Sequence, residues 1–207
     1  MSPHQLLIFS KCKMILLLAL ILLVLYLIPT YKKPVVIQNL ITEEEKNYVI
    51  RKAKEELKPS QVSDENTVDT RVRKSETAWL DIDDPVISQI AEKCLKFTDR
   101  PKVNCESMQV VKYKPGGYYK PHYDTLNDDN PRLYTFLIAL NDDYEGGETE
   151  FPNMKKSFKM NACDGLLFYT TDNYELVTSK ALHGGRPVKS GEKWICNLWI
   201  RKYAYNS

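Results

Sequence analysis

The chain changes from helix-type to strand-type sequence at about residue 106, and this change restricts the possible folds more than any other feature. Beyond it, short apolar stretches rich in β-branched and aromatic residues alternate with Asn, Asp, Gly and Pro clusters, as at 127–131 and 145–147. Short strands without intervening helices form closed or double-sheet all-β folds. We therefore expect a mainly β fold with a jelly-roll core. The predicted strands are residues 108–113, 118–124, 133–140, 148–151, 166–170 and 193–203.

Two α-helices are predicted before the strands, on the outside of this core. Thr42 and Glu45 form a capping-box pattern, and apolar residues then recur at helical spacing. Asp84 followed by Pro85 is the pattern of an N-cap and a first helical position. Between the two helices, the polar and charged residues 61–75 predict an exposed, mobile loop.

An unbroken apolar run, residues 14–28, lies near the N-terminus, and no charged residue occurs between Lys13 and Lys32. A membrane-spanning helix needs roughly 17–25 such residues, so the run predicts a transmembrane signal anchor over residues 14–31 behind a tail of residues 1–13. A cleaved signal peptide is the second interpretation, and a buried core helix is the third. The flanking lysines balance, so they indicate no membrane orientation.

Net charge and cysteine spacing limit the classes of function. The formal net charge is +2 with acids and bases interspersed, so no nucleic-acid-binding surface is predicted. The five cysteines include no CxxC pair, which argues against a zinc site. Four of them follow the apolar run and could form disulfides or be buried thiols, because spacing alone does not decide. These four are Cys94, Cys105, Cys163 and Cys196.

Two histidines of the β region carry the clearest chemical pattern, since His4, the third in the chain, precedes the apolar run. His122 and Asp124 lie two positions apart on a predicted strand, so their side chains point to the same face. With His183 from another strand they could form a two-histidine, one-carboxylate set, which suits Fe(II) because it leaves positions open for substrate and dioxygen. Alone, a His-x-Asp pair is more often a structural histidine beside its partner.

Three ordered motifs surround these residues. The first is residues 109–124 (QVVKYKPGGYYKPHYD), and the second is residues 133–152, which contain EGGET. The third is HGGRPV at 183–188, followed by GEKW at 191–194. Together they resemble the catalytic domain of prolyl 4-hydroxylases, the collagen-type branch of the 2-oxoglutarate/Fe(II)-dependent dioxygenases.

The resemblance implies a double-stranded β-helix (jelly roll) and a division into regions. Residues 106–204 would form the dioxygenase domain, and residues 35–105 a helical support region with a mobile substrate loop at about 61–79. Residues 69–79 are similar to the family's segment that closes over bound peptide. The loop that follows residue 124 is shorter than in longer relatives, which leaves the shape of one side of the groove open.

The resemblance also implies a role for each matched side chain. Lys193 would pair with the distal carboxylate of 2-oxoglutarate, because a buried dicarboxylate needs a buried cation. A lysine here, rather than an arginine, favours prolyl hydroxylation over the lysyl hydroxylase and nucleic-acid demethylase branches. Ordinary packing or a solvated surface is the alternative at each of these positions. The matched residues are His122, Asp124 and His183 for iron, Lys193, Tyr113 and Thr149 for 2-oxoglutarate, and Tyr119, Arg132, Trp199 and Arg73 for the peptide groove.

The implied activity is 4-hydroxylation of proline in collagen-like or Pro-rich polypeptides, with oxidative decarboxylation of 2-oxoglutarate to succinate and CO2. Fe(II) would be the cofactor, 2-oxoglutarate and O2 the co-substrates, and ascorbate the reductant. A Pro-rich substrate would present a polyproline II strand to an aromatic groove. The alternatives are a hydroxylase of another protein substrate and a non-catalytic, membrane-tethered jelly-roll binding module. Relatives with such anchors face the lumen of the endoplasmic reticulum, where we expect this domain; the oligomeric state is not predicted.

Overall fold

The computed structural model describes residues 3–61, 68–125 and 129–205, and the chain divides into two compact units, Met1–Thr30 and Tyr31–Ser207. The first unit contains helix α1 (Pro3–Leu27), whose described apolar side chains, such as Leu16 and Leu18, are exposed. In the described part of the chain, no helix is both long enough and apolar enough to cross a membrane. The transmembrane anchor predicted over residues 14–31, and with it the membrane as a partner, is therefore unsupported.

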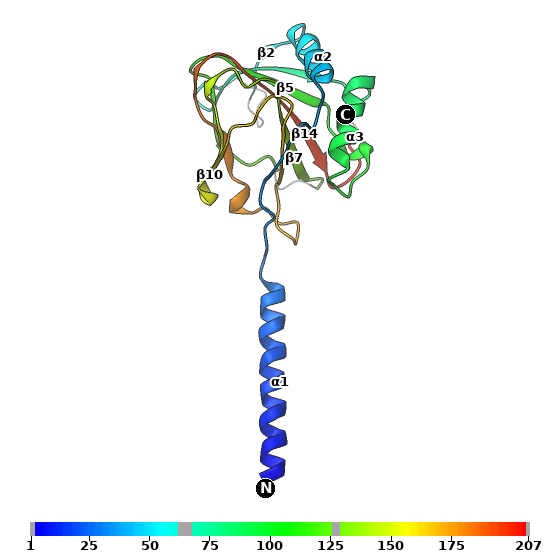
Figure 1. Ribbon diagram of the computed structural model, residues 1–207, viewed down its shortest axis with the longest axis vertical. Helices are drawn as coiled ribbons and strands as arrows, with labels where there is room; N and C mark the ends of the chain where they lie inside the picture. The colour runs from blue at the N-terminus through cyan, green and yellow to red at the C-terminus, as the bar shows by residue number, and fades with distance from the viewer. Residues whose placement is uncertain (1–2, 62–67, 126–128, 206–207) are drawn as a thin grey trace. The chain divides into compact units, whose positions relative to one another are not determined.

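The second unit is built from antiparallel sheets (Figure 1). A major sheet has the strand order β1-β11-β7-β14-β5-β4-β2, a minor sheet has the order β10-β9-β12-β6-β3, and β13 pairs with β8. This arrangement confirms the prediction of a mainly β, jelly-roll-like fold. The strands are β1 (Val35–Ile37), β2 (Lys58–Pro59), β3 (Arg73–Lys74), β4 (Glu76–Leu80), β5 (Met108–Tyr113), β6 (Tyr118–His122), β7 (Arg132–Ala139), β8 (Glu145–Gly146), β9 (Thr149–Phe151), β10 (Lys156–Phe158), β11 (Gly165–Tyr169), β12 (His183–Gly185), β13 (Val188–Ser190) and β14 (Lys193–Arg201).

The six strands predicted from the sequence correspond to β5, β6, β7, β9, β11 and β14. Strand β5 has the predicted bounds, whereas β6 ends at His122, so Asp124 lies just beyond the strand rather than on it. The strands that were not predicted have two to five residues each. Such short segments give no clear periodicity, because a period of two needs several repeats to be recognised.

The loop predicted over residues 61–79 is wrong for its second half. Residues 73–74 form β3, which pairs with β6, and residues 76–80 form β4, which pairs with β5. The polar composition was misleading because Arg73 and Thr77 are buried polar residues that line a cavity. Residues 62–67 of the predicted loop lie outside the described residues.

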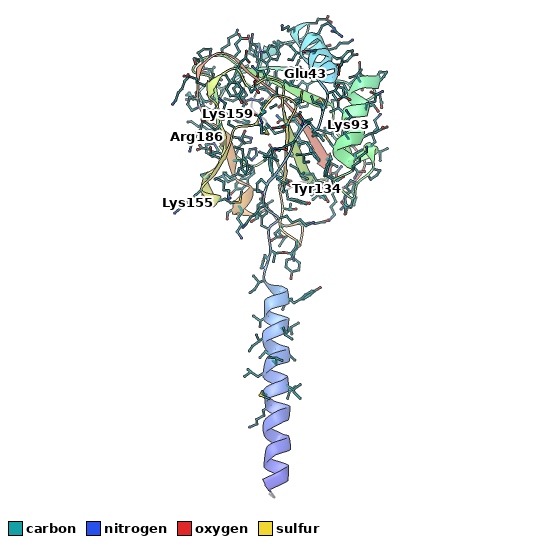
Figure 2. All side chains as sticks on the ribbon, in the orientation of Figure 1. Glu43, Lys93, Tyr134, Lys155, Lys159 and Arg186 are labelled. Atoms are coloured by element: carbon teal, nitrogen blue, oxygen red, sulfur yellow. The ribbon has the colours of Figure 1, made fainter. Side chains whose placement is uncertain are left out.

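Both predicted helices of this unit are confirmed, and they lie together at one side of the β-sheets (Figure 1). Helix α2 (Glu43–Lys54) has Thr42 as its N-cap in a complete capping box with Glu45, and helix α3 (Pro85–Leu95) is capped by Asp84. Lys93 of α3, labelled in Figure 2, donates a 2.6 Å hydrogen bond to Glu45 of α2. The same glutamate therefore caps one helix and ties it to the other. Short 3₁₀ turns occur at Lys102–Asn104, Pro152–Met154 and Ser179–Ala181.

Alternate residues of the major sheet face two different cores. Met108 and Val110 of β5 pack with the buried residues of α2 and α3, whereas Val111 and Tyr113 belong to a second core that includes Phe151 and Phe168. Strand β14 alternates in the same way, and its second face points into the space between the sheets. The four cysteines of this unit are buried free thiols, so of the two alternatives for them the structure supports the thiols.

Candidate metal centre and co-substrate pocket

A cross-strand histidine pair forms the centre of the site. Strands β6 and β12 are antiparallel neighbours in the minor sheet, and their register places His183 directly opposite His122. The two imidazole ring centroids are 4.4 Å apart. Asp124, two residues beyond β6, lies between them: its carboxylate oxygens are 3.6 Å from Nε2 of His122 and 3.6 Å from Nε2 of His183. The structure thus brings together the three residues that the sequence predicted as ligands.

Backbone carbonyls fix the orientation of both imidazoles. Nδ1 of His122 lies 2.8 Å from the carbonyl oxygen of Lys120, and Nδ1 of His183 lies 3.0 Å from that of Ala181. These contacts favour the tautomer with the proton on Nδ1, which leaves the Nε2 lone pair free toward Asp124. The Asp124 carboxylate is held as well, because Thr135 of β7 donates a 2.7 Å hydrogen bond to one of its oxygens.

Burial sets the charge states of the buried histidine and the carboxylate. It lowers the pKa of His183 to about 4, although Asp124 opposes this shift, so the imidazole is neutral at pH 7. Burial alone would raise the pKa of Asp124, but His183 and His122 outweigh it and hold that pKa below its usual range. A neutral imidazole and an ionised carboxylate are the forms that bind metals.

This donor set fits a transition-metal ion. One nitrogen from each histidine and one carboxylate oxygen lie within 4.8 Å of one another, so a single ion could reach all three. Two imidazoles and one carboxylate suit Fe(II), because three donors on one face leave the other coordination positions open.

A cavity of about 930 Å³ opens beside these three residues, and all ten site residues predicted from the sequence line it. Side-chain alternation along β14 explains why Lys193 and Trp199 line the same cavity. Residues 193, 195, 197 and 199 face the cavity, and the residues between them face the core that packs against the helices. The cavity therefore extends along β14 from Lys193 to Trp199.

Lys193 is a buried cation at one end of the cavity. It is opposite Tyr113 in the pairing of β14 with β5, and it is 3% exposed. Its Nζ donates a 2.6 Å hydrogen bond to the carbonyl oxygen of Gly147, which leaves two of its three donor hydrogens for other partners. Burial lowers the pKa of Lys193 to about 8, with Glu148 acting in the opposite direction. Thr149, also buried, lines the same cavity.

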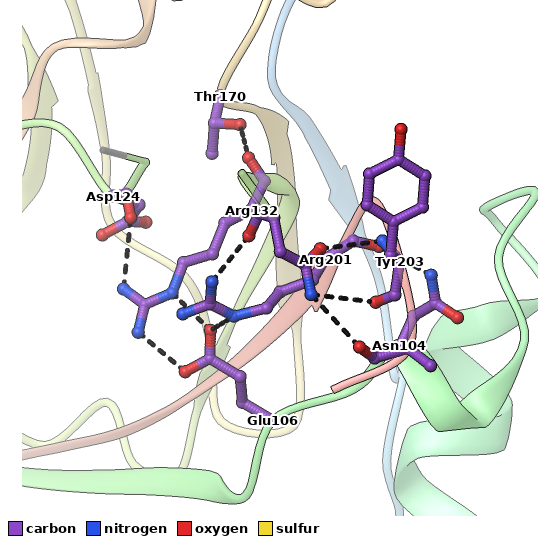
Figure 3. A network of polar contacts seen from close by, with 9 residues as sticks. Asn104, Glu106, Asp124, Arg132, Thr170, Arg201 and Tyr203 are labelled. Atoms are coloured by element: carbon purple, nitrogen blue, oxygen red, sulfur yellow. Dashed lines mark hydrogen bonds and ion pairs between the residues drawn. The ribbon is translucent and has the colours of Figure 1, made fainter. Parts of the chain in front are cut away.

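A partly buried ion-pair network adjoins Asp124 (Figure 3). Arg132 donates to both carboxylate oxygens of Glu106 at 2.6 and 2.7 Å, and Arg201 donates to the same carboxylate at 2.8 Å. Arg132 also donates a 3.2 Å hydrogen bond to the carbonyl oxygen of Asp124. Its guanidinium lies over the Trp199 ring, 3.8 Å from the ring centroid. One arginine thus connects a predicted ligand to a predicted groove residue.

Sequence reasoning missed several residues of the site. Thr135 and Asn197 sit at alternating positions of predicted strands, so their orientation could have been inferred once one pocket-facing residue of each strand was known. Nothing in the sequence indicated Glu106, because a single acidic residue at the start of a strand is usually solvated. The other missed lining residues include Trp79 and Gln109.

Comparison with known proteins agrees with this geometry. The model of the 2OG-Fe(II) oxygenase superfamily matches residues 108–201. A protein of Acanthamoeba polyphaga mimivirus named "Putative prolyl 4-hydroxylase" is 35% identical over 188 residues, which cover 85% of this chain and 77% of that protein. Prolyl 4-hydroxylase 1 of Arabidopsis thaliana is 33% identical over 195 residues, covering 82% and 69%.

This chain belongs to the prolyl 4-hydroxylases of the 2OG-Fe(II) oxygenase superfamily. It also resembles the crystal structure of the viral collagen prolyl hydroxylase from Paramecium Bursaria Chlorella virus-1 in its 2-oxoglutarate complex, with a TM-score of 0.69 and 34% identity. The similarity covers 83% of this chain and 97% of that one. This prolyl 4-hydroxylase is accordingly an Fe(II)- and 2-oxoglutarate-dependent oxygenase with the jelly-roll-like fold of its family.

Removing one histidine of the triad tests the metal centre. We expect His183→Ala to lower Fe(II) or Mn(II) affinity by more than about 100-fold, since loss of an outer-shell partner alone costs roughly 10–100-fold. Calorimetric titration under anaerobic conditions measures this affinity. His4→Ala removes a histidine of the first unit, Met1–Thr30, which contains no residue of the triad. This variant is the matched control and should bind the metal like the wild type. Equal affinities for the two variants would contradict the assignment.

Proposed function

We propose that this prolyl 4-hydroxylase holds Fe(II) with His122, Asp124 and His183, binds 2-oxoglutarate with Lys193, and acts on Pro-rich or collagen-like polypeptides. The observation that carries the proposal is that the triad and a buried lysine line one cavity. A binding module would have no use for a buried cation beside a metal-binding triad. Membership in an enzyme family likewise argues against the non-catalytic alternative.

Fe(II) together with 2-oxoglutarate would activate dioxygen for oxidation of a C–H bond while 2-oxoglutarate is decarboxylated to succinate and CO2. The protein's contribution is to orient the donors before any ligand arrives. Each imidazole is fixed by a backbone carbonyl, and Thr135 holds the Asp124 carboxylate. Such preorganisation would let the three side chains bind one ion without rearrangement, beside the cavity that they line.

Lys193 would bind the distal carboxylate of 2-oxoglutarate. Among the described residues no carboxylate lies within ion-pair distance of it, although the side chain is buried, and a dicarboxylate would supply the missing counter-charge. Tyr113, its cross-strand neighbour, and Thr149 bring hydroxyl groups to the same end of the cavity. These two residues would donate hydrogen bonds to that carboxylate.

The peptide would lie along the other end of the cavity, against Tyr119, Arg132, Trp199 and Arg73. Supporting this proposal, Nε1 of Trp199 is buried and has no hydrogen-bond partner in the described part of the protein. Proline has no backbone N–H, so a Pro-rich chain offers carbonyl acceptors, which match an unused indole donor. The rings of Trp199 and Trp79 have centroids 5.9 Å apart and are tilted by 40° to each other. They add an apolar surface of the kind that polyproline II strands bind.

A second candidate is hydroxylation of a different protein substrate. It shares the same metal and co-substrate residues and differs in the peptide alone. Ascorbate as the reductant and the lumen of the endoplasmic reticulum as the location stay predictions from the sequence.

A peptide panel tests the substrate class. Purified enzyme with Fe(II), 2-oxoglutarate and ascorbate should release succinate in step with the gain of one oxygen atom per hydroxylated proline, measured by mass spectrometry. The panel should contain Pro-Pro-Gly repeats, polyproline and peptides of mixed sequence without proline. We expect turnover with the first two and none with the third. Turnover of 2-oxoglutarate without oxidation of any proline peptide would contradict the proposed substrate and favour the second candidate.

The lowered pKa of Lys193 predicts how 2-oxoglutarate binding depends on pH. The lysine is charged below its pKa of about 8 and neutral above it, while both carboxylates of the co-substrate stay ionised throughout. The KM for 2-oxoglutarate should therefore be constant below about pH 8 and rise about tenfold per pH unit above it. Steady-state kinetics from about pH 6.5 to about pH 9.5 measure this, with the KM for the peptide as control. A flat KM for 2-oxoglutarate across the range would contradict the role of Lys193.

A further inference from the structure

Arg73 is a buried cation without an anionic partner. Its side chain is 6% exposed, and its hydrogen bonds go to neutral groups: Ser75 Oγ at 2.9 Å, Gln109 Oε1 at 3.3 Å and Thr77 Oγ1 at 3.4 Å. Within the described ranges, no carboxylate lies in ion-pair distance of its guanidinium. Burial of a charge without a counter-ion costs free energy, so this arrangement needs an explanation beyond stability.

The minor sheet places Arg73 in one cross-strand row with Thr149, one of the predicted co-substrate residues. The register pairs Thr149 with Gly185, Gly185 with Tyr119, and Tyr119 with Arg73, across strands β9, β12, β6 and β3. Directly paired residues of adjacent strands share a face of the sheet. A Cβ at Gly185 would lie 3.8 Å from its nearest neighbour, so the row has a gap at this position between the side chains of Thr149 and Tyr119. All four residues line the cavity.

Arg73 also reaches across the cavity to the major sheet. It donates hydrogen bonds to Gln109 of β5 and Thr77 of β4, and together with Ser75 it opposes the rise in the pKa of Tyr113 that burial causes. Tyr113 is in turn the cross-strand partner of Lys193. The guanidinium of Arg73 is therefore connected to the end of the cavity where the distal carboxylate of 2-oxoglutarate would bind.

A second contact connects Arg73 to the metal centre. Its guanidinium lies over the Tyr119 ring, 4.7 Å from the ring centroid. The Tyr119 ring also stacks on the imidazole of His122, with ring centroids 3.6 Å apart and an interplanar angle of 20°. The cation, the phenol and the metal-binding imidazole thus form a continuous stack. Because β3 is a two-residue edge strand, these side-chain contacts add to the short backbone ladder that joins it to β6.

We propose that Arg73 is a positioning residue for 2-oxoglutarate. It would act on the co-substrate through the Tyr113 hydroxyl and through its own positive charge, and it would couple the co-substrate site to the peptide groove on β3 and β6. The proposal rests on the proposed function. By orienting the Tyr113 hydroxyl, Arg73 prepares a donor for the distal carboxylate, and its charge adds to that of Lys193 in attracting the dianion. A residue that only contacted the peptide would leave 2-oxoglutarate binding unchanged.

Arg73→Gln tests the proposal, because it keeps a polar side chain and removes the charge. We expect its KM for 2-oxoglutarate to rise about tenfold, the loss typical of a charged hydrogen bond. The peptide KM should rise by a smaller factor, because Arg73 also lines the proposed peptide groove. Arg73→Lys should recover part of the loss. Anaerobic titration of the Fe(II) enzyme with 2-oxoglutarate, followed by absorbance, measures binding without peptide or turnover. Arg51→Gln is the matched control: Arg51 is an exposed arginine of α2 that lies over the Tyr48 ring, 5.4 Å from its centroid, does not line the cavity, and should behave like the wild type when replaced.

A double-mutant cycle tests whether Arg73 acts through Tyr113. In Arg73→Lys combined with Tyr113→Phe, the effect on 2-oxoglutarate affinity should be smaller than the product of the two single effects. A rise in the peptide KM alone, independent effects in the cycle, or equal behaviour of Arg51→Gln and Arg73→Gln would overturn the proposal. These results differ from failure of the proposed function, in which the wild type itself would oxidise no proline peptide.

Discussion

The pairing of β6 with β12 is the interaction on which the rest of the site depends. Its register places the two imidazoles opposite each other, and the end of β6 at His122 lets the chain turn so that Asp124 reaches both Nε2 atoms. Gly184 makes this pairing possible, because a Cβ there would lie 2.9 Å from the carbonyl oxygen of Tyr119. A shift of one residue in the register would turn one imidazole to the other face of the sheet. The grouping of these three side chains is therefore a consequence of strand pairing.

The major sheet contributes the second half of the site through the alternation of its side chains. One face of β14 packs against α2 and α3, which fixes the strand, and the other face presents Lys193 and Trp199 to the cavity. The helices themselves supply no residue of the triad; they pack against the sheet whose other face lines the cavity. The buried Glu106 carboxylate is tolerated here because Arg132 and Arg201 both donate hydrogen bonds to it.

The sequence predicted the longer elements and the chemistry, while the short elements required the structure. Capping patterns at Thr42 and Asp84 identified both helices of the folded unit, because caps are local interactions between near neighbours. The short strands β3 and β4 were taken for a loop, since the buried Arg73 and Thr77 look like surface residues when their surroundings are unknown. Glu106 could not be predicted, because its importance comes from two arginines that are distant in the chain.

Diffraction from crystals grown with Mn(II) and 2-oxoglutarate under anaerobic conditions tests the central claim most directly, because anomalous scattering locates the metal independently of activity. We expect one metal ion bonded to Nε2 of both histidines and to the Asp124 carboxylate, at about 2.0–2.2 Å, with the distal carboxylate of 2-oxoglutarate at Lys193 Nζ. A metal ion bound elsewhere, or a 2-oxoglutarate molecule whose distal carboxylate lies away from Lys193, would contradict the account.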